Sequence, residues 1–302
     1  MPVIPCCHCY ALKFGVNGLW IGPTLTSFKK MLTDISNGKQ AVHDFWNNAS
    51  CGETLYLAGR DRVGYEAQAL RRYELEAFIL DFAKFKESCN RKVLEIGVGL
   101  GADHQCFASA GAELYGIDLT QRAIEHTRHR LSCFGLTSRL AVGDAENLAF
   151  DEESFDIVYS WGVLHHSPDT PRAVQEVHRV LKRGGVGCIM IYHTWSLIGL
   201  MLWMRYALFR MRPFTSLKTV YARYLESPGT KAYSVSEARQ LFAEFSDVRI
   251  KTVLTHGDLL SSDAGQRHQG MALNLARKIW PRLLIRRLLP NAGLFMLIEA
   301  RK

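Results

Sequence analysis

The chain has 302 residues and a formal net charge of +8, with 48% hydrophobic and 22% charged residues. These proportions are ordinary for a globular protein, and the length suits one large domain with insertions or two small ones. The eight cysteines are scattered, which argues against a disulfide framework and favours a reducing cytoplasm. We expect a cytoplasmic protein, because no signal peptide is evident and no apolar stretch reaches the ~20 residues that span a bilayer.

Residues 1–40 show little hydrophobic periodicity, and we interpret them as an N-terminal extension that need not be ordered. They include Cys6-Cys7-His8-Cys9, which resembles a metal-binding tract. Its ligands are too crowded for one tetrahedral zinc site and no second ligand pair follows, so we predict no metal.

Residues 41–90 form the next predicted segment, in which helical spacing runs from Gly64 to about Ser88. Ahead of that helix, Phe45-Trp46-Asn47 and Cys51-Gly52-Glu53 lie among small polar residues. They either fold over an active site or form a surface loop.

The apolar run from Val93 to Ile96 leads into three alternate glycines, Gly97, Gly99 and Gly101. This pattern predicts a buried strand, a tight turn and a helix, with a turn backbone that can press against a ligand. A second apolar run ends at Asp118, and an acid at this spacing suits the two hydroxyls of a ribose. Together these features predict a nucleoside-containing cofactor.

The segment 91–193 alternates strands with helices and predicts an α/β doubly wound, mostly parallel sheet. Thr120 is expected to cap one helix, Thr170-Pro171 starts another, and Lys182-Arg183-Gly184-Gly185 ends that second helix. The strands expected after the first are 112–117, 139–142, 155–160 and 186–192.

Residues 194–302 do not continue the strand–helix alternation of the preceding segment and are expected to contain helical insertions. Trp195–Arg212 is strongly apolar with arginines at one end, and Met271–Leu289 has the pattern of a basic apolar helix. Ser234-Val235-Ser236-Glu237 is a capping box that predicts a further helix. Two last strands are expected at Val248–Leu254 and Leu294–Ala300.

The glycine-rich turn also satisfies the G-x-G-x-x-G/A pattern of NAD-binding proteins. Three features favour S-adenosylmethionine (SAM) instead. Glu95 precedes the turn and would attract an ammonium but repel a pyrophosphate, and no nearby lysine or arginine is aimed at phosphate. Asp144 follows the third strand and can accept from an adenine amino group, while the amide of Ala145 can meet a ring nitrogen.

The ordered set Glu95–Gly101, Gly116–Leu119, Gly143–Glu146, Phe155–Val158 and Leu181–Gly185 resembles the class I SAM-dependent methyltransferases, within them the type 11, ubiquinone-biosynthesis-like group. The resemblance covers about Arg91–Tyr192. It implies a Rossmann-like sheet of seven strands whose last strand is antiparallel, and a helical lid over the cofactor in residues 41–90.

Candidate site residues follow from the motifs and from the resemblance. Because ligands of parallel sheets lie beyond the carboxyl ends of strands, the loop after the fourth strand should border the reacting atoms. His165 or His166 there could act as general base, although either ring could instead bond the backbone. Substrate contacts are predicted for Trp161, Tyr192 and His193. Cofactor contacts are predicted for Tyr73, Glu95, Gly97, Gly99, Gly101, Asp118, Leu119, Asp144, Ala145 and Ser160.

The predicted reaction is in-line methyl transfer from SAM to oxygen or carbon of a small, apolar or lipid-like molecule. Positioning alone can catalyse such a displacement, so the histidines need not be essential. Nucleic acid is disfavoured as acceptor, since Ser160-Trp161-Gly162-Val163 stands where amino methylases carry Asp/Asn-Pro-Pro-aromatic. The two apolar basic insertions favour a hydrophobic or membrane-lodged acceptor and peripheral membrane contact, or else they pack on the core or form a dimer interface. The alternatives are an NAD-dependent oxidoreductase and a non-catalytic SAM-binding regulator.

Overall fold

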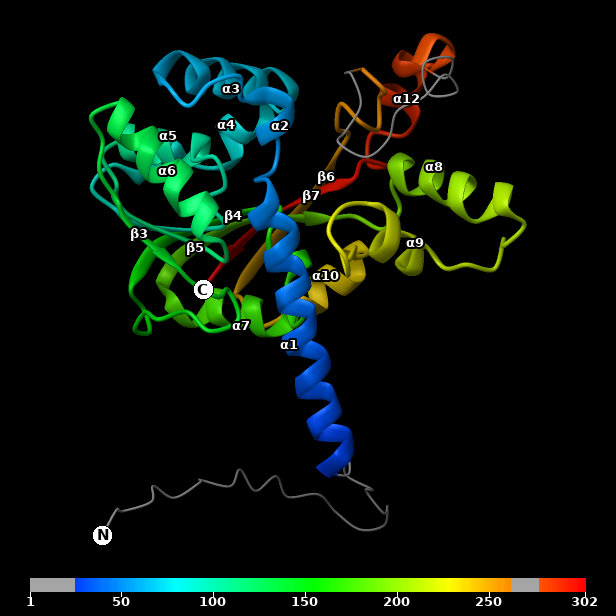
Figure 1. The fold of residues 1–302 in the computed structure, drawn as a ribbon, viewed down its shortest axis with the longest axis horizontal. Helices are drawn as coiled ribbons and strands as arrows, with labels where there is room; N and C mark the ends of the chain where they lie inside the picture. Colours follow the sequence, from blue (N-terminus) through cyan, green and yellow to red (C-terminus); the bar gives the residue numbers. More distant parts are fainter. Residues whose placement is uncertain (1–24, 262–276) are drawn as a thin grey trace.

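The structure is a computed structural model that describes residues 25–261 and 277–302 (Figure 1). The Cys6–Cys9 tract, the first part of the expected extension and residues 271–276 of the expected basic helix lie outside these residues. Within the described chain, no helix is both long and apolar enough to cross a bilayer.

A seven-stranded sheet forms the centre of the molecule, in the order β3-β2-β1-β4-β5-β7-β6. Strand β7 pairs antiparallel with both β5 and β6, and the pairings among β1 to β5 are parallel. This confirms the predicted mostly parallel sheet with an antiparallel last strand. The strands are β1 (Lys92–Ile96), β2 (Glu113–Asp118), β3 (Arg139–Val142), β4 (Phe155–Trp161), β5 (Leu181–Tyr192), β6 (Asp247–Val253) and β7 (Phe295–Arg301).

Helices cover both faces of the sheet, as the nearly continuous apolar character of β4 and β5 requires (Figure 1). On one face Val93, Ile157 and Tyr159 pack with Ile79 and Phe107 from the helices. The helices on this side are α3 (Arg62–Leu75), α4 (Phe78–Phe82), the 3-10 turn η1 (Phe85–Ser88), α5 (Ala102–Ser109) and α6 (Gln121–Cys133).

The opposite face is covered by α7 (Thr170–Val180) and α10 (Val235–Leu241). Val174 and Val177 of α7 and Ala238 of α10 pack on Val158 and Ile189 of the sheet. The predicted capping box of α10 is present, with Ser234 and Glu237 bonded in both directions. The cap of α7 is Asp169 rather than the predicted Thr170, because the Asp169 carboxylate accepts from the Arg172 amide.

Helix α1 (Leu25–Asn48) includes residues 25–40 of the segment interpreted as an extension that need not be ordered. Two expected boundaries were wrong. The single helix expected from Gly64 to Ser88 is interrupted where Glu76 leaves helical geometry and again at Lys84, whose φ is +58°. Strand β5 starts at Leu181, so the basic Lys182-Arg183 pair lies in the strand rather than ending the preceding helix.

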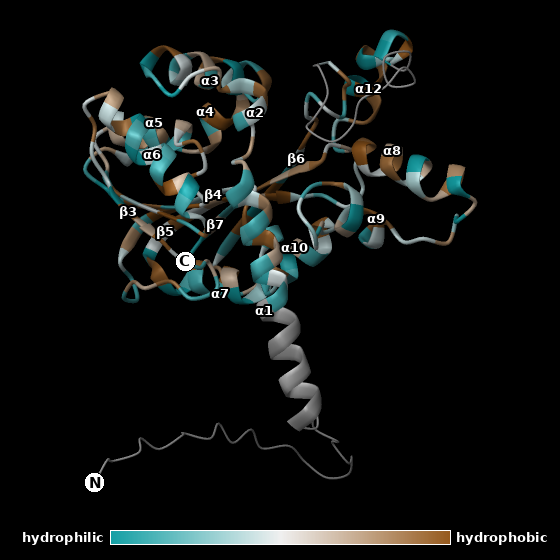
Figure 2. Cartoon of the chain, viewed as in Figure 1, coloured by the Kyte–Doolittle hydropathy of each residue, from teal (hydrophilic) through white to brown (hydrophobic). Residues whose placement is uncertain are grey.

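Two arms project from the β5-β7-β6 side of the sheet (Figure 1). The first arm, residues 195–225, contains α8 (Leu197–Tyr206), the 3-10 turn η3 (Leu208–Arg210) and α9 (Leu217–Tyr224). The second arm, residues 277–293, contains α12 (Arg282–Leu288). Leu197 and Ile285 meet around Leu259 in a small core that joins the two arms. Helix α8 is hydrophobic at the end nearer the sheet and includes hydrophilic residues toward its far end (Figure 2).

Candidate cofactor and active site

A cavity of about 1070 Å³ lies at the carboxyl ends of β1, β2 and β4. Ligands of doubly wound sheets bind at this edge, because the loops that follow parallel strands converge there. Its walls come from distant parts of the chain: α1, the short helix α2 (Glu53–Tyr56), α3, the glycine-rich turn and both arms. The structure thus brings together segments that the sequence analysis treated separately.

The glycine-rich turn forms one wall of the cavity with its backbone. Gly97 has a φ of +85°, and a Cβ there would lie 2.1 Å from Cγ2 of Val163. Gly101 has a φ of +75°, and a Cβ there would lie 2.8 Å from Oγ1 of Thr127. Both positions therefore require glycine for conformation and for space. Gly97, Gly99 and Gly101 all line the cavity, as the motif predicted.

Asp118 lies at the end of β2 and ties the glycine turn to the next helix. Its Oδ1 accepts from the amide and the hydroxyl of Thr120, both at 2.9 Å, and its Oδ2 accepts from the Gly99 amide at 3.2 Å. Burial raises the pKa of this carboxyl against the effect of these donors. Asp118 and Leu119 both line the cavity beside the turn.

Asp144 and Ala145 line the cavity next to β3. The Oδ1 of Asp144 accepts from the Glu146 amide at 2.9 Å, which fixes the turn. Its Oδ2 accepts from the ammonium of Lys39 on α1 at 2.7 Å, and Lys39 also pairs with Glu146 at 2.5 Å. Burial opposes the charge of Lys39, but these two carboxylates raise its pKa. The Asp144 carboxylate is therefore already paired with Lys39 on the side where an adenine amino group was expected to bind.

Glu95 lines the cavity and is 3% exposed. Its Oε2 lies 2.8 Å from Nδ1 of His104, whose Nε2 lies 2.7 Å from the Ser138 hydroxyl. Ser138 donates its own proton to the Leu114 carbonyl, so it accepts from Nε2–H of His104. Burial raises the pKa of Glu95 and lowers that of His104 to about 3, so both shifts favour the uncharged forms.

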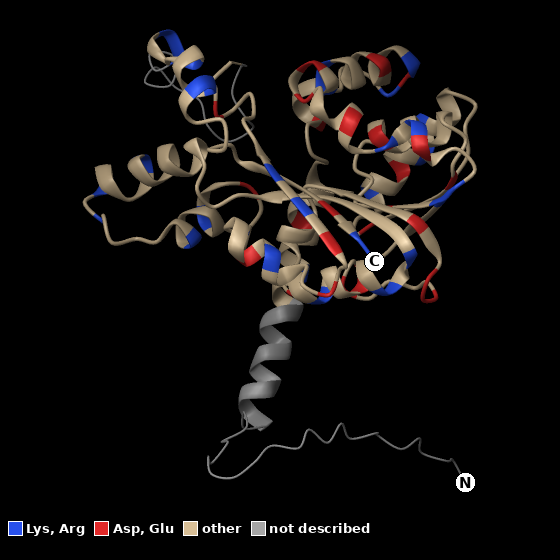
Figure 3. Cartoon of the chain, turned by 180° about the vertical axis from the view of Figure 1, so that it is seen from behind, with Lys and Arg blue, Asp and Glu red and all other residues tan. Residues whose placement is uncertain are grey.

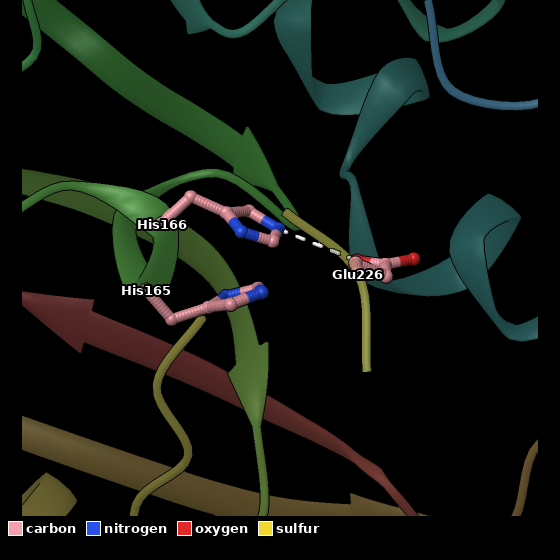
Figure 4. A group of neighbouring side chains, drawn as sticks. All are labelled: His165, His166 and Glu226. Atoms are coloured by element: carbon pink, nitrogen blue, oxygen red, sulfur yellow. Dashed lines mark ion pairs between the residues drawn. The ribbon is translucent and has the colours of Figure 1, made fainter. Parts of the chain in front are cut away.

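Two histidines follow β4 in the 3-10 turn η2 (Leu164–His166), and only His166 lines the cavity. Nδ1 of His166 lies 2.8 Å from the Ser227 hydroxyl and 3.1 Å from the Thr230 hydroxyl. Its Nε2 faces the Glu226 carboxylate at 3.4 Å (Figure 4). His165 is fully buried beside it, and burial lowers its pKa far below the usual range. Of the two, His166 has the geometry of a proton acceptor from a ligand in the cavity.

Comparison with known proteins agrees with this site. Residues 94–189, from β1 to within β5, match the family model described as a methyltransferase domain. The chain carries a class I SAM-dependent methyltransferase domain of type 11. The resemblance predicted from the motifs is therefore confirmed.

Curated relatives match this methyltransferase domain. The uncharacterized methyltransferase YcgJ of Bacillus subtilis is 37% identical over 31% of this chain and 38% of its own length. The phthiotriol/phenolphthiotriol dimycocerosates methyltransferase of Mycobacterium leprae is 40% identical over 32% of this chain and 35% of its own. The chain thus spans less than two fifths of either relative.

A solved structure extends the likeness of fold beyond the domain. It is phosphoethanolamine N-methyltransferase 2 of Haemonchus contortus in complex with phosphomonomethylethanolamine and S-adenosylhomocysteine, 19% identical with a TM-score of 0.53. The match covers 93% of this chain and 61% of that one. At this identity the comparison bears on the fold alone.

Besides His165, three predicted residues do not line the cavity of the methyltransferase domain. The Tyr73 hydroxyl donates at 2.9 Å to Asp103 of α5, which does line the cavity. The Ser160 hydroxyl donates to the Ile96 carbonyl inside the sheet. The ring of His193 lies 3.2 Å from the Gly293 carbonyl, so it fixes the second arm to β5. Trp161 and Tyr192 line the cavity as predicted.

Several cavity residues were not predicted from the sequence. Arg72, one residue before Tyr73, lines the wall and forms a two-bond ion pair with Asp103. Glu76 is buried nearby, and burial raises its pKa to about 7. Glu226 accepts from the Tyr192 hydroxyl at 2.6 Å. No motif marks these residues, because the end of α3 and the loop after α9 meet only in the fold.

Proposed function

We propose that this chain transfers a methyl group from SAM to a small apolar molecule. One observation carries the proposal: a single cavity joins the glycine turn and its acids to the aromatic end of β4 and β5 and to both arms. The turn suits the cofactor because it lines the cavity with backbone, and nothing lies within 4 Å of the place a Cβ would take at Gly99. Asp118 would hold the ribose, Asp144 the adenine and the backbone of 97–101 the amino-acid part.

SAM supplies an electrophilic methyl group on a positively charged sulfur. The task of the protein is to hold the acceptor atom in line with that methyl group, which can contribute several kcal/mol up to ~7–11 in ideal cases. Trp161 and Tyr192 are placed to orient an acceptor beside the cofactor. His166, backed by Glu226, can take a proton from an acceptor hydroxyl or acidic carbon, worth roughly 10²–10⁴-fold.

The apolar class of acceptor is supported by the wall that the arms contribute. Met201, Leu202, Met204 and Phe209 from the first arm and Trp280 from the second line the cavity opposite the glycine turn. Such a wall binds an apolar group through burial rather than hydrogen bonds. The two named enzymes above have different acceptors in their names, so the domain alone does not set the substrate. The wall supports an apolar acceptor molecule.

We further propose that the arms dock on an anionic bilayer. Eleven of the sixteen exposed large hydrophobic residues described lie on the two arms, including Phe214 at 100% and Leu283 at 84%. Each arm has five lysines or arginines and no aspartate or glutamate in its sequence. Figure 3 shows Lys and Arg on α12 and at the tip of α8. Apolar side chains among arginines match the acyl and headgroup layers of such a membrane, and the same arms line the cavity.

A ligand titration separates the proposed methyltransferase from the first alternative function. Isothermal titration of the full chain with S-adenosylhomocysteine and separately with NADH distinguishes a methyltransferase from an NAD-dependent oxidoreductase. We expect micromolar binding of S-adenosylhomocysteine that weakens at least tenfold in Asp118→Asn, because a buried acceptor for charged hydrogen bonds is lost. Exposed Asp151→Asn is the matched control. Micromolar binding of NADH alone would end the proposal.

Turnover then separates an enzyme from a non-catalytic SAM-binding regulator. The chain is incubated with labelled SAM and a lipid extract, and the extract is searched by mass spectrometry for a molecule that has gained a methyl group. Cofactor binding with no methylated product from any lipid or polar extract would favour the regulator.

A further inference from the structure

Three potential metal ligands converge beside the cavity. Figure 4 shows the rings of His165 and His166 side by side with the carboxylate of Glu226 opposite them. One ligand atom of each residue lies within 4.8 Å of the others, and His166 and Glu226 line the cavity. The two histidines follow β4, and Glu226 follows α9, so the group joins the methyltransferase domain to the end of the first arm.

His165 lacks the hydrogen bonds that a buried imidazole needs. It is 0% exposed, and neither Nδ1 nor Nε2 has a hydrogen-bond partner among the described residues. Leaving such a group unsatisfied costs about 1–3 kcal/mol, and native proteins seldom accept this without a reason. The ring contacts His166 and Tyr192, with centroids at 4.3 and 3.9 Å, which holds it at the group.

The surroundings of His166 leave its Nε2 available as a ligand. The hydroxyls of Ser227, at 2.8 Å, and Thr230, at 3.1 Å, hold Nδ1 of His166, so Nε2 is the ring nitrogen directed at Glu226. Nε2 and the Glu226 carboxylate lie 3.4 Å apart. In the tautomer with the proton on Nδ1, the Nε2 lone pair and the carboxylate would both face a cation placed between them.

We propose that His165, His166 and Glu226 bind one divalent transition-metal ion, with Zn²⁺ as the best-matched example, with open positions toward the cavity. Two imidazoles and a carboxylate are a common ligand set for such ions. Ligand bonds of about 2.1 Å place neighbouring ligand atoms of a tetrahedral site about 3.4 Å apart. That is the separation of His166 Nε2 and Glu226 Oε2, and the ligand atom of His165 lies within 4.8 Å of the other two.

The group also has the outer hydrogen bonds that orient metal ligands. Ser227 and Thr230 hold Nδ1 of His166, and the Tyr192 hydroxyl donates to Glu226. If the proposed methyl transfer is correct, the ion would bind an acceptor hydroxyl and lower its pKa. The hydroxyl proton then passes to water, the oxygen forms the new bond to the methyl carbon, and the electron pair of the broken C–S bond returns to sulfur.

Metal binding is testable without turnover. The tag-free full chain is stripped with chelator and titrated with Zn²⁺ by calorimetry and with Co²⁺ by visible absorption. Every variant is made in a Cys6→Ser/Cys7→Ser/Cys9→Ser background, so that the N-terminal tract cannot bind the added ion. We expect about one ion per chain, and at least tenfold weaker binding in Glu226→Gln and in His166→Asn.

His178→Gln is the matched control, since His178 lies on α7 and is partly exposed. Thermal unfolding reports whether each variant folds, and Glu226→Gln is the safer variant because Glu226 is 30% exposed. Uptake below a tenth of an equivalent, or Glu226→Gln binding as tightly as the parent, would overturn the site and leave His166 and Glu226 as a simple acid–base pair. S-adenosylhomocysteine titration of the same samples tests the proposed function separately.

Discussion

At the residue scale, the carboxylate of Glu53 shows how a single side chain holds the cover of the cavity. Arg122 on α6 donates to it from Nε at 2.8 Å and from Nη2 at 2.5 Å, and the Ser50 amide donates at 2.9 Å. The Arg122 hydrogen bonds, the Ser50 amide and the charge of nearby His126 lower the pKa of Glu53 to about 2. Its neighbours Gly52, Leu55 and Tyr56 line the cavity, so Glu53 anchors α2 over it.

Glu53→Gln should lower the free energy of unfolding by about 1–2 kcal/mol at neutral pH, because charge-assisted hydrogen bonds are lost. The folded-state pKa of about 2 lies below the unfolded value near 4.3. The contribution of the charge is therefore complete above about pH 4.5 and fades as the pH falls toward 2. Urea unfolding at pH 7, 4.5 and 3 measures this, with exposed Glu74→Gln as control. A stability difference that stays constant with pH would contradict the assignment.

The sequence indicates positions that backbone geometry fixes more readily than the direction in which a single side chain points. The glycines and Asp118 were predictable because a tight turn and a strand end fix their places. Tyr73, a predicted cofactor contact, does not line the cavity, whereas its neighbour Arg72 does. Ser160 does not line it either, because alternation along β4 turns its hydroxyl toward the Ile96 carbonyl.

At the element scale, Asp103 joins α3, α5 and β4. Its carboxylate accepts from Arg72 Nε and Nη2, from the Tyr73 hydroxyl and from the Tyr159 hydroxyl, at 2.6 to 3.0 Å. Burial alone would raise its pKa, but Arg72 and the hydroxyls keep the pKa below its usual range. Helix α3 is thereby fixed beside the cavity, with Arg72 on the cavity wall.

Asp103→Asn should destabilise the fold by about 3 kcal/mol, because it leaves Arg72 charged and without its main partner in a nearly buried place. The same change should weaken binding of S-adenosylhomocysteine, since α3 would no longer be held at the cavity. Denaturant unfolding and calorimetry measure the two effects. Asp81→Asn, an exposed acid on α4, is the control and should change neither quantity. A loss of stability below 1 kcal/mol would show that the network is not holding α3.

Strands and helices with strong periodicity were predictable as elements, and their ends were less so. The β6 and β7 strands agree with the sequence to within one residue at each end. By contrast, α1 was missed, and the described side chains at its end contact segments that are distant in the sequence. Lys39 shows this: it meets Asp144 and Glu146 across more than 100 residues of chain.

At the scale of the whole molecule, the two arms carry exposed apolar side chains and positive charge, and both arms line the cavity. Asp258 fixes their bases, because its carboxylate accepts from the amides of Ile198, Thr255 and Leu294. The apolar and basic composition of both arms could be read from the sequence. That they meet at one cavity depends on the fold of β5, β6 and β7. The proposed membrane contact therefore belongs to the assembled molecule rather than to either helix alone.

Replacing Met211, Phe214 and Leu283 by serine should abolish most vesicle binding without affecting the cavity. These side chains are 89%, 100% and 84% exposed and do not line the cavity. Inserted apolar groups contribute about 0.8 kcal/mol per buried CH₂, so losing three should weaken binding at least tenfold. Co-flotation with vesicles of phosphatidylcholine containing about a third phosphatidylserine measures it. The matched control replaces three exposed apolar residues far from the arms: Val63, Leu70 and Leu80.

The charge of the second arm is tested in the same assay. Arg286→Gln/Arg287→Gln should weaken binding to anionic vesicles about tenfold or more, at roughly 1 kcal/mol per charge. Binding to pure phosphatidylcholine should change little, and added salt should reduce the difference because it screens the headgroup charge. Equal flotation of the parent chain, the serine variant and its control would show that the arms meet something other than a bilayer. Their apolar surface would then have to be covered by protein.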